Sequence, residues 1–107
     1  MTFEEFDIYQ EVLLKEVVRM KDTKGKEYSH SGNRFANFNR LADGLELPNI
    51  TIAWIYAYKH VDSIISYVKE GKEFSNEGIR GRLVDLIVYL TLIGGMIEEK
   101  SIDPFLG

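Results

Sequence analysis

The feature that most constrains this chain is an apolar run of eleven residues, from Leu83 to Ile93, whose one charged member is Asp85. Because the run is apolar on every face of a helix, the sequence predicts that this helix is buried. A carboxylate in an apolar interior costs several kcal/mol unless a partner neutralises it and donates hydrogen bonds. The expected partners are Lys59 and His60, at the centre of the preceding predicted helix. The sequence therefore predicts a polar site between helices.

Length and composition narrow the class of protein. The 107 residues suit a single domain, residues 1–107, and a core of this size is commonly supplemented by self-association. Without cysteine, disulfides and thiolate metal sites are excluded. The acidic N-terminus lacks the layout of a signal peptide, and the apolar run that ends at Ile97 is shorter than the about 20 residues of a bilayer span. We therefore expect a cytoplasmic protein with no membrane partner.

The charge is unevenly distributed along the chain. The net charge is −4, but the segment from Lys15 to Arg40 holds seven cations and three anions. A net negative charge argues against a nucleic-acid polymer as partner, because such binding needs an excess of clustered cations. Cations gathered around one segment suit a small anionic ligand, and a solvated loop with ordinary surface lysines is the alternative.

The first predicted helix is defined by a capping box and a polar stretch. Thr2 and Glu5 have the capping-box spacing, and apolar residues follow at helical spacing as far as Met20. We expect this helix to end near Asp22. The polar residues 22–32 then read as a long loop.

Three further helices are predicted, over 35–43, 49–70 and 76–99, and no strand pattern is visible. The sequence therefore indicates an all-α protein, in its simplest form a four-helix bundle. Two glycines inside the last helix, Gly94 and Gly95, permit a close approach or a kink. The residues that mark the helix ends are Gly44, Pro48, Gly71 and Ser75.

Each long helix carries a predicted interior stripe. His60 lies on the stripe of the third helix, whereas Asp85 lies on a face next to the stripe of the fourth, aligned with Arg82 and Tyr89. The third-helix stripe is Ile50, Ala53, Trp54, Ala57, Val61, Ile64, Ile65 and Val68. The fourth-helix stripe is Ile79, Leu83, Leu86, Ile87, Leu90 and Ile93.

Candidate ligand-binding residues gather in three segments: the basic loop, the short helix and the two long helices. The short helix alternates amides and guanidinium groups with aromatic rings, which suits base and phosphate contacts, although helix capping and plain solvation are alternatives. The long helices bring titratable groups into one apolar volume, with a satisfied core histidine as the alternative. In chain order the candidates are Lys24, Lys26, Tyr28, Arg34, Phe35, Asn37, Arg40, Lys59, His60, Arg82, Asp85 and Tyr89.

Catalysis has weaker support in the sequence. Phosphate chemistry with Mg²⁺ needs several carboxylates that converge on one point, and the later helices offer Asp62, Glu77 and Asp85. Two distant histidines without cysteine disfavour zinc. No cofactor is therefore expected, apart from Mg²⁺ if the protein is an enzyme.

The order and spacing of four sequence blocks resemble the small MazG-like, nucleotide-modification-associated proteins of phages and prophages. The resemblance implies an all-α pyrophosphatase-like bundle that forms a homo-oligomer, with a nucleotide pocket between helices. Active members of the wider superfamily carry a Glu-Glu-x-x-Glu block and a later Glu-x-x-Asp block. Here Asp85 matches the final aspartate, Arg82 replaces the glutamate, and the first block is missing. The matching blocks are Lys24-x-Lys26-Glu27-Tyr28, Asn33 to Ala42, Tyr58-Lys59-His60-x-x-Ser63-Ile64 and Asp85 to Leu90.

Three functions remain in competition on this reading. The first is a protein that binds and sequesters a nucleotide or nucleotide-derived signal, as a phage protein in the host cytoplasm could do against host defence. The second is a Mg²⁺-dependent nucleoside triphosphate pyrophosphohydrolase that uses Asp85, Asp62 and Glu77. The third is a structural or protein-binding bundle in which Asp85 and Lys59 form a buried ion pair.

Overall fold

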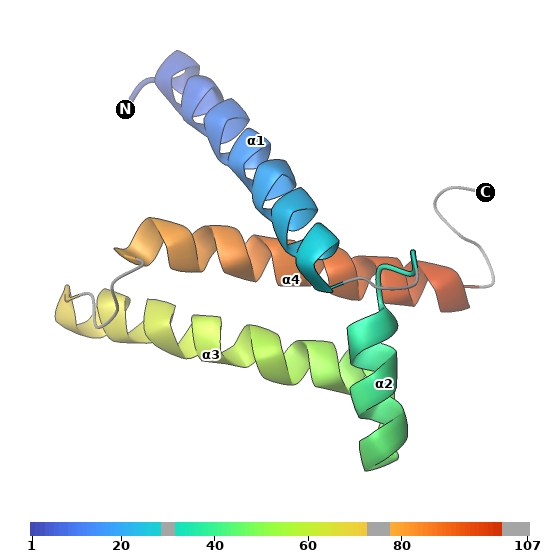
Figure 1. The fold of residues 1–107 in the computed structure, drawn as a ribbon. Coiled ribbons are helices and arrows are strands. Elements are labelled where there is room, and N and C mark those ends of the chain that lie inside the picture. Colours follow the sequence, from blue (N-terminus) through green and yellow to red (C-terminus); the bar gives the residue numbers. More distant parts are fainter. Residues whose placement is uncertain (29–31, 73–77, 102–107) are drawn as a thin grey trace.

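The computed structural model describes residues 1–28, 32–72 and 78–101, with the backbone alone for 25–28. The described residues form four helices and no strand, which confirms the all-α prediction (Figure 1). None of these helices is both long enough and apolar enough to cross a membrane. The helices are α1 (Phe3–Tyr28), α2 (Ala36–Leu45), α3 (Asn49–Glu70) and α4 (Gly78–Lys100).

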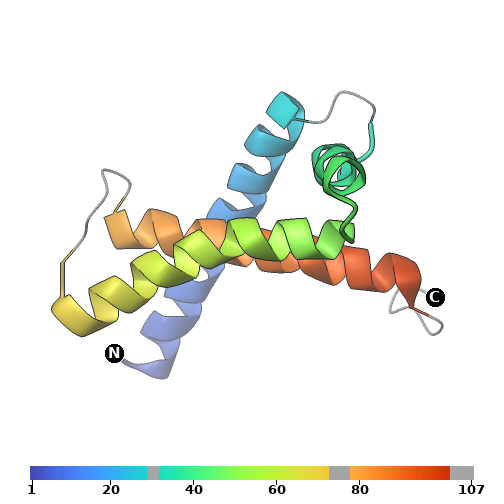
Figure 2. The ribbon, with the colours of Figure 1, turned by 90° about the horizontal axis from the view of Figure 1, so that it is seen from below.

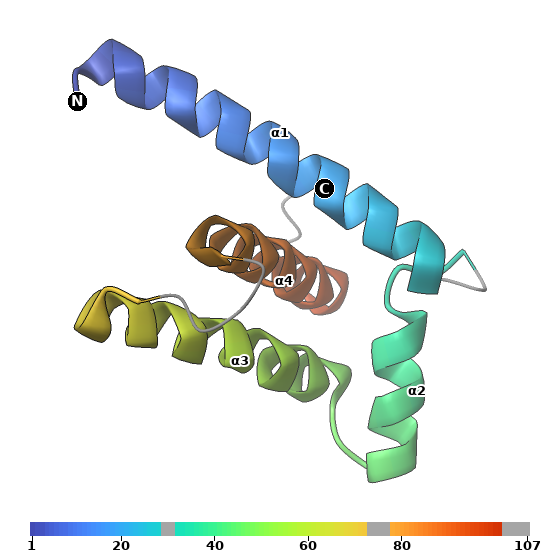
Figure 3. The same cartoon turned by 60° about the vertical axis from the view of Figure 1, so that its left-hand side comes forward.

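Helices α3 and α4 form the most extensive helix pair and lie side by side as an antiparallel hairpin (Figure 3). Helix α1 crosses over α4, and its N-terminal half extends beyond the body of the protein. Helix α2 packs across the start of α3 at a steep angle (Figure 2). The C-terminal half of α1, α2 and the hairpin therefore surround a common volume.

Helix α1 begins as predicted and ends later than predicted. The backbone N–H of Glu5 donates to Oγ1 of Thr2 at 3.1 Å, so Thr2 is the N-cap. The helix continues to Tyr28, where the sequence predicted a loop after Asp22. A glycine inside a helix costs only about 1 kcal/mol, so Gly25 is a weak stop signal. In the turn before this glycine, Lys24 contacts Asp85 of α4 and the carbonyl of Lys21 accepts from Arg34, and both contacts favour the helical course there.

Helix α2 also passes the glycine that was predicted to end it. Gly44 lies inside the helix, and Glu46 is the residue that turns left-handed, with φ of 56°. The N–H of Leu47 donates to the carbonyl of Ala42 at 3.0 Å and closes this end. The predicted ends of α3 are confirmed, because Pro48 precedes its first residue and Gly71 adopts φ of 67° after its last.

The core has two parts, one on each side of α4. The first joins α2, α3 and α4, and it includes Met96, which is fully buried. In this part the ring of Phe35 packs against Gly95, where an added Cβ would lie 3.0 Å from Cζ of the ring. Gly95 therefore permits the close approach that the sequence predicted. The second part joins α1 to α4 through Val17, Val84 and Val88.

The buried face of α4 differs from the predicted one. Its buried residues are Val84, Asp85, Val88 and Met96. The predicted interior stripe is only partly covered, and Leu90 keeps 47% of its surface exposed. Because α4 is apolar on nearly every side, its sequence carries little information about which side faces the core.

Candidate functional site

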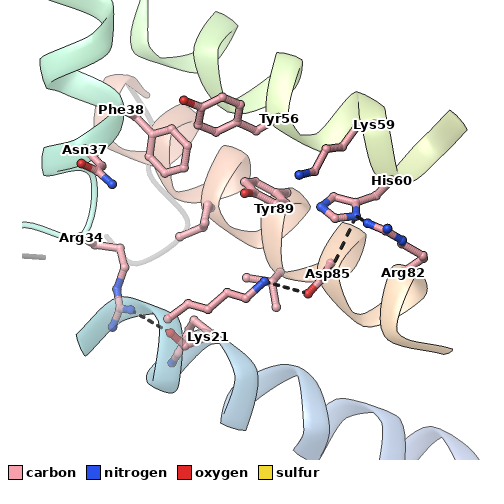
Figure 4. A pocket seen from close by; sticks show the side chains of 13 residues that line it. Lys21, Arg34, Asn37, Phe38, Tyr56, Lys59, His60, Arg82, Asp85 and Tyr89 are labelled. Atoms are coloured by element: carbon pink, nitrogen blue, oxygen red, sulfur yellow. Dashed lines mark hydrogen bonds and ion pairs between the residues drawn. The ribbon is translucent and has the colours of Figure 1, made fainter. Parts of the chain in front are cut away.

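A cavity of about 440 Å³ lies where the four helices meet (Figure 4). This size falls within the range of about 300–1,000 Å³ that is typical of small-molecule sites. Each helix contributes to the lining, so the site exists only in the folded arrangement. The lining residues are Lys21, Lys24, Arg34, Asn37, Phe38, Tyr56, Lys59, His60, Arg82, Asp85, Val88, Tyr89 and Leu92.

Asp85 lies at the floor of the cavity and is buried, as the sequence predicted. Its partner is Lys24 of α1, whose Nζ donates to Oδ1 of Asp85 at 3.1 Å. The expected partner Lys59 lines the cavity but forms no ion pair with Asp85 among the described residues. The expectation of Lys59 was wrong because helical spacing shows which residues share a face, not which helix lies opposite.

His60 is buried beside Asp85, with Nδ1 at 3.9 Å from Oδ2 of the carboxylate. Burial lowers the pKa of His60, and Arg82 lowers it further, while the charge of Asp85 acts in the opposite direction. His60 is therefore neutral at pH 7. Because an arginine can only donate, Nδ1 of His60 accepts from Nη1 of Arg82 at 3.3 Å, and the ring proton lies on Nε2.

An aromatic wall lies next to these charged groups. Phe38, Tyr56 and Tyr89 form it, with ring centroids 6.0 to 6.5 Å apart and tilted or edge-on contacts. Tyr89 also stacks on the imidazole of His60 at 5.5 Å, with 29° between the ring planes. The cavity therefore has an apolar, flat-sided part beside a polar part (Figure 4).

The described lining contains five cationic side chains and one carboxylate. The carboxylate is already neutralised by Lys24. Arg34 and Lys59 have no carboxylate partner among the described residues, and Arg34 donates to the backbone carbonyl of Lys21 at 3.3 Å. In a chain with net charge −4, this local excess of positive charge makes the cavity attractive to an anion.

Most of the predicted ligand residues meet at this cavity, and the others do not. Phe35 is buried in the core instead of facing the cavity, and Arg40 lies outside the lining, where it donates to Oδ1 of Asn37. The side chains of Lys26 and Tyr28 lie outside the described part of the chain. The predicted residues that line the cavity are Lys24, Arg34, Asn37, Lys59, His60, Arg82, Asp85 and Tyr89.

Sequence reasoning missed Lys21, Phe38 and Tyr56 as part of the site. Lys21 lies three residues before Lys24, so a longer first helix would have placed both on one face. Phe38 lies three residues after Phe35, and Tyr56 lies four residues before His60. Helical spacing from the predicted candidates could thus have found these residues.

No carboxylate cluster forms in the described residues. Asp62 is exposed on α3 and outside the cavity, and Glu77 lies in the part that is not described. Within the described ranges no three histidine, cysteine, aspartate or glutamate side chains are placed to hold a metal ion. Asp85 is therefore the single carboxylate of the described lining.

Comparison of the chain with protein-family models, curated proteins and solved structures finds no match. The MazG-like resemblance accordingly stays a prediction from four sequence blocks. The class defined by the fold and the site is an all-α protein with a basic, aromatic-sided cavity between its helices.

Proposed function

We propose that this protein binds a small phosphate-bearing ligand of the nucleotide type in the four-helix cavity and holds it without hydrolysis. The observation that carries the proposal is the excess of cationic side chains directly beside the wall of Phe38, Tyr56 and Tyr89. Phosphate groups need clustered donors, and a base needs an aromatic or apolar surface. This cavity offers both the clustered donors and the aromatic surface.

In this proposal the phosphates lie towards Arg34 and Lys59, two lining cations that form no ion pair with a described carboxylate. Arg34 offers a planar set of donors that suits a phosphate in a bidentate contact. The base lies against the aromatic wall. Asn37 adds an amide at the same edge of the cavity that donates and accepts hydrogen bonds with a base edge.

The small number of carboxylates in the described cavity lining favours binding without turnover. Hydrolysis of a phosphate ester with Mg²⁺ places the ion between protein carboxylates and phosphate oxygens. Asp85 is the one carboxylate among the described lining residues, and it is paired with Lys24 at 3.1 Å. Arg82, at the position where the MazG-like pattern has glutamate, adds a positive charge instead. A sequestering role, such as removal of a host defence signal by a phage protein, fits these properties.

The first experiment identifies the ligand and its fate together. The purified protein is incubated with Mg²⁺ and a panel of nucleotides that includes cyclic dinucleotides and ADP-ribose derivatives, then denatured by heat, and the released compounds are analysed. Recovery of one intact, enriched compound supports the proposal. A monophosphate with pyrophosphate would instead identify a pyrophosphohydrolase, and a panel that is neither retained nor changed would favour a structural bundle.

Variants test whether the cavity is the binding site. Arg34→Ala and Lys59→Ala should each weaken binding of the recovered compound about tenfold or more, because a hydrogen bond to a charged group contributes about 1.5–3 kcal/mol. Lys69→Ala is the matched control, since Lys69 is exposed on the same helix as Lys59 and lies outside the cavity. Equal affinities for Lys59→Ala and Lys69→Ala, measured by calorimetry, would refute this location.

A further inference from the structure

Helix α3 carries an exposed apolar stripe on a side that does not face α4. Its members follow each other in alternating steps of four and three residues, which is the heptad spacing of a helix that packs against another helix. Four of the five residues expose between 43% and 77% of their surface, and Val61 is half-buried. The stripe consists of Trp54, Tyr58, Val61, Ile65 and Val68.

Helix α4 carries a second stripe with the same heptad spacing. None of its six members is buried, and Leu90 and Ile97 expose 47% and 56% of their surfaces. Most of these residues belong to the stripe that the sequence marks as interior. The stripe consists of Ile79, Leu83, Leu86, Leu90, Ile93 and Ile97.

The two stripes lie on the same side of the hairpin. At 3.6 residues per turn, the α3 stripe lies about 120° around its axis from the side that carries His60 and faces α4. The α4 stripe lies about 80° around its axis from the side that carries Tyr89 and faces α3, in the same rotational sense. Because the helices are antiparallel, equal senses of rotation bring both stripes to one side. We call this side the hairpin face.

The hairpin face stays exposed, although the N-terminal half of α1 extends past the hairpin on that side. Helix α2 and the cavity lie on the other side, where Phe38 contacts Tyr56 and Tyr89. In Figure 2, which views the hairpin edge-on, α2 lies on one side and the N-terminal half of α1 emerges on the opposite side. The exposed rings of Phe6 and Tyr9 lie in this overhanging half of α1 and continue the helix face that carries Val17.

We propose that the hairpin face docks against the hairpin face of a second copy of this chain, so that two hairpins form a four-helix packing across a two-fold axis. Two heptad stripes on one hairpin present the knobs and holes that such a packing requires. In a two-fold contact the same surface patch of both copies forms the interface. Neither stripe contains a charged residue, so two copies meet there without like-charge repulsion despite the net charge of −4.

The exposed apolar area is comparable with the area that a stable dimer buries. A standard interface buries about 800 Å² on each partner, of which roughly 57%, or about 450 Å², is apolar. An aromatic side chain buries about 150–250 Å², and an aliphatic one about 60–120 Å². Scaled by their exposed fractions, the stripe residues supply roughly 300–500 Å² per copy. The six residues counted are Trp54, Tyr58, Ile65, Val68, Leu90 and Ile97.

The test is the mass of the full chain in solution, measured by light scattering and by sedimentation equilibrium at several concentrations. The parent should be a dimer. Ile65→Glu, on α3, and Leu90→Glu, on α4, should each raise the dimer dissociation constant at least 100-fold. Ile55→Glu is the matched control, because Ile55 is the same residue type on the same helix and is 53% exposed, but it lies off the stripe. It should remain a dimer.

A second measurement avoids charge and possible unfolding. The chain has no cysteine, so Ile65→Cys and Ile55→Cys each introduce a single thiol. A homobifunctional maleimide should link two copies through residue 65 and not through residue 55.

A monomeric parent, a dimer that both glutamate variants leave intact, or equal cross-linking at the two positions would overturn the proposal. The cavity lies on the other side of the hairpin, so loss of dimerisation and loss of ligand binding are separate outcomes.

Discussion

Removal of Lys24 should leave Asp85 as a buried carboxylate without a countercharge. The Asp85 side chain is 6% exposed and that of Lys24 is 42% exposed, with 3.1 Å between Nζ and Oδ1. Breaking a fully buried pair costs about 3–5 kcal/mol, and an exposed pair contributes about 0–1 kcal/mol. Because water reaches the lysine side of this pair, we expect Lys24→Met to cost about 1–3 kcal/mol of unfolding free energy.

A double-mutant cycle isolates the interaction itself. Lys24→Met, Asp85→Asn and the double variant are unfolded in urea at one protein concentration and followed by far-ultraviolet circular dichroism, and the coupling should be about 1–2 kcal/mol. The control cycle uses Lys15 and Glu11, an ion pair at 3.2 Å whose side chains are 76% and 68% exposed. That coupling should stay below about 0.5 kcal/mol. Equal couplings in the two cycles would show that burial of Asp85 does not strengthen its ion pair.

Two further predictions test the core and the cavity. Gly94→Ala should raise the unfolding free energy by about 1 kcal/mol, because nothing lies within 4 Å of the new Cβ. The unfolding free energy of Gly95→Ala should be about 1–3 kcal/mol lower than that of Gly94→Ala, because the new Cβ would lie 3.0 Å from Cζ of Phe35. Equal denaturation midpoints for the two variants would contradict this packing. The lowered pKa of His60 means that the unfolded chain binds the proton more tightly, so stability should be full above pH 6.5 and fall as the pH drops towards the folded-state pKa. His60→Gln should flatten that part of the stability curve, and a pH profile identical to that of the parent would refute the assignment.

The helix ends that depend on local chemistry could be predicted from the sequence, whereas the ends that depend on distant contacts could not. Thr2, Pro48 and Gly71 act through hydrogen bonds and backbone angles within one turn. The polar stretch with Gly25 predicted a loop after Asp22, and Gly44 predicted the end of the short helix, yet a glycine costs a helix only about 1 kcal/mol. The contact of Lys24 with Asp85 lies directly before Gly25, and the closing hydrogen bond at Leu47 lies beyond Gly44.

The candidate site was predictable as a set of residues and not as a set of pairs. Helical spacing placed Arg82, Asp85 and Tyr89 on one face of α4, and all three line the cavity. The pairing of Asp85 with Lys24 required knowledge of how α1 crosses α4, which no spacing within a helix contains. A single charged residue in an apolar run therefore indicates a polar site, while the identity of its partner depends on the tertiary arrangement.

The way in which α1 attaches to the rest of the fold has a consequence for the order of folding. Helices α3 and α4 are neighbours along the chain and pair locally, whereas Val17 must find Val84 and Val88 across most of the sequence. Loop closure over such a distance is slower than formation of the hairpin. Lys21 and Lys24 arrive with α1, so we expect their part of the cavity to be completed in the last step of folding. A ligand that binds there should therefore stabilise the docked position of α1.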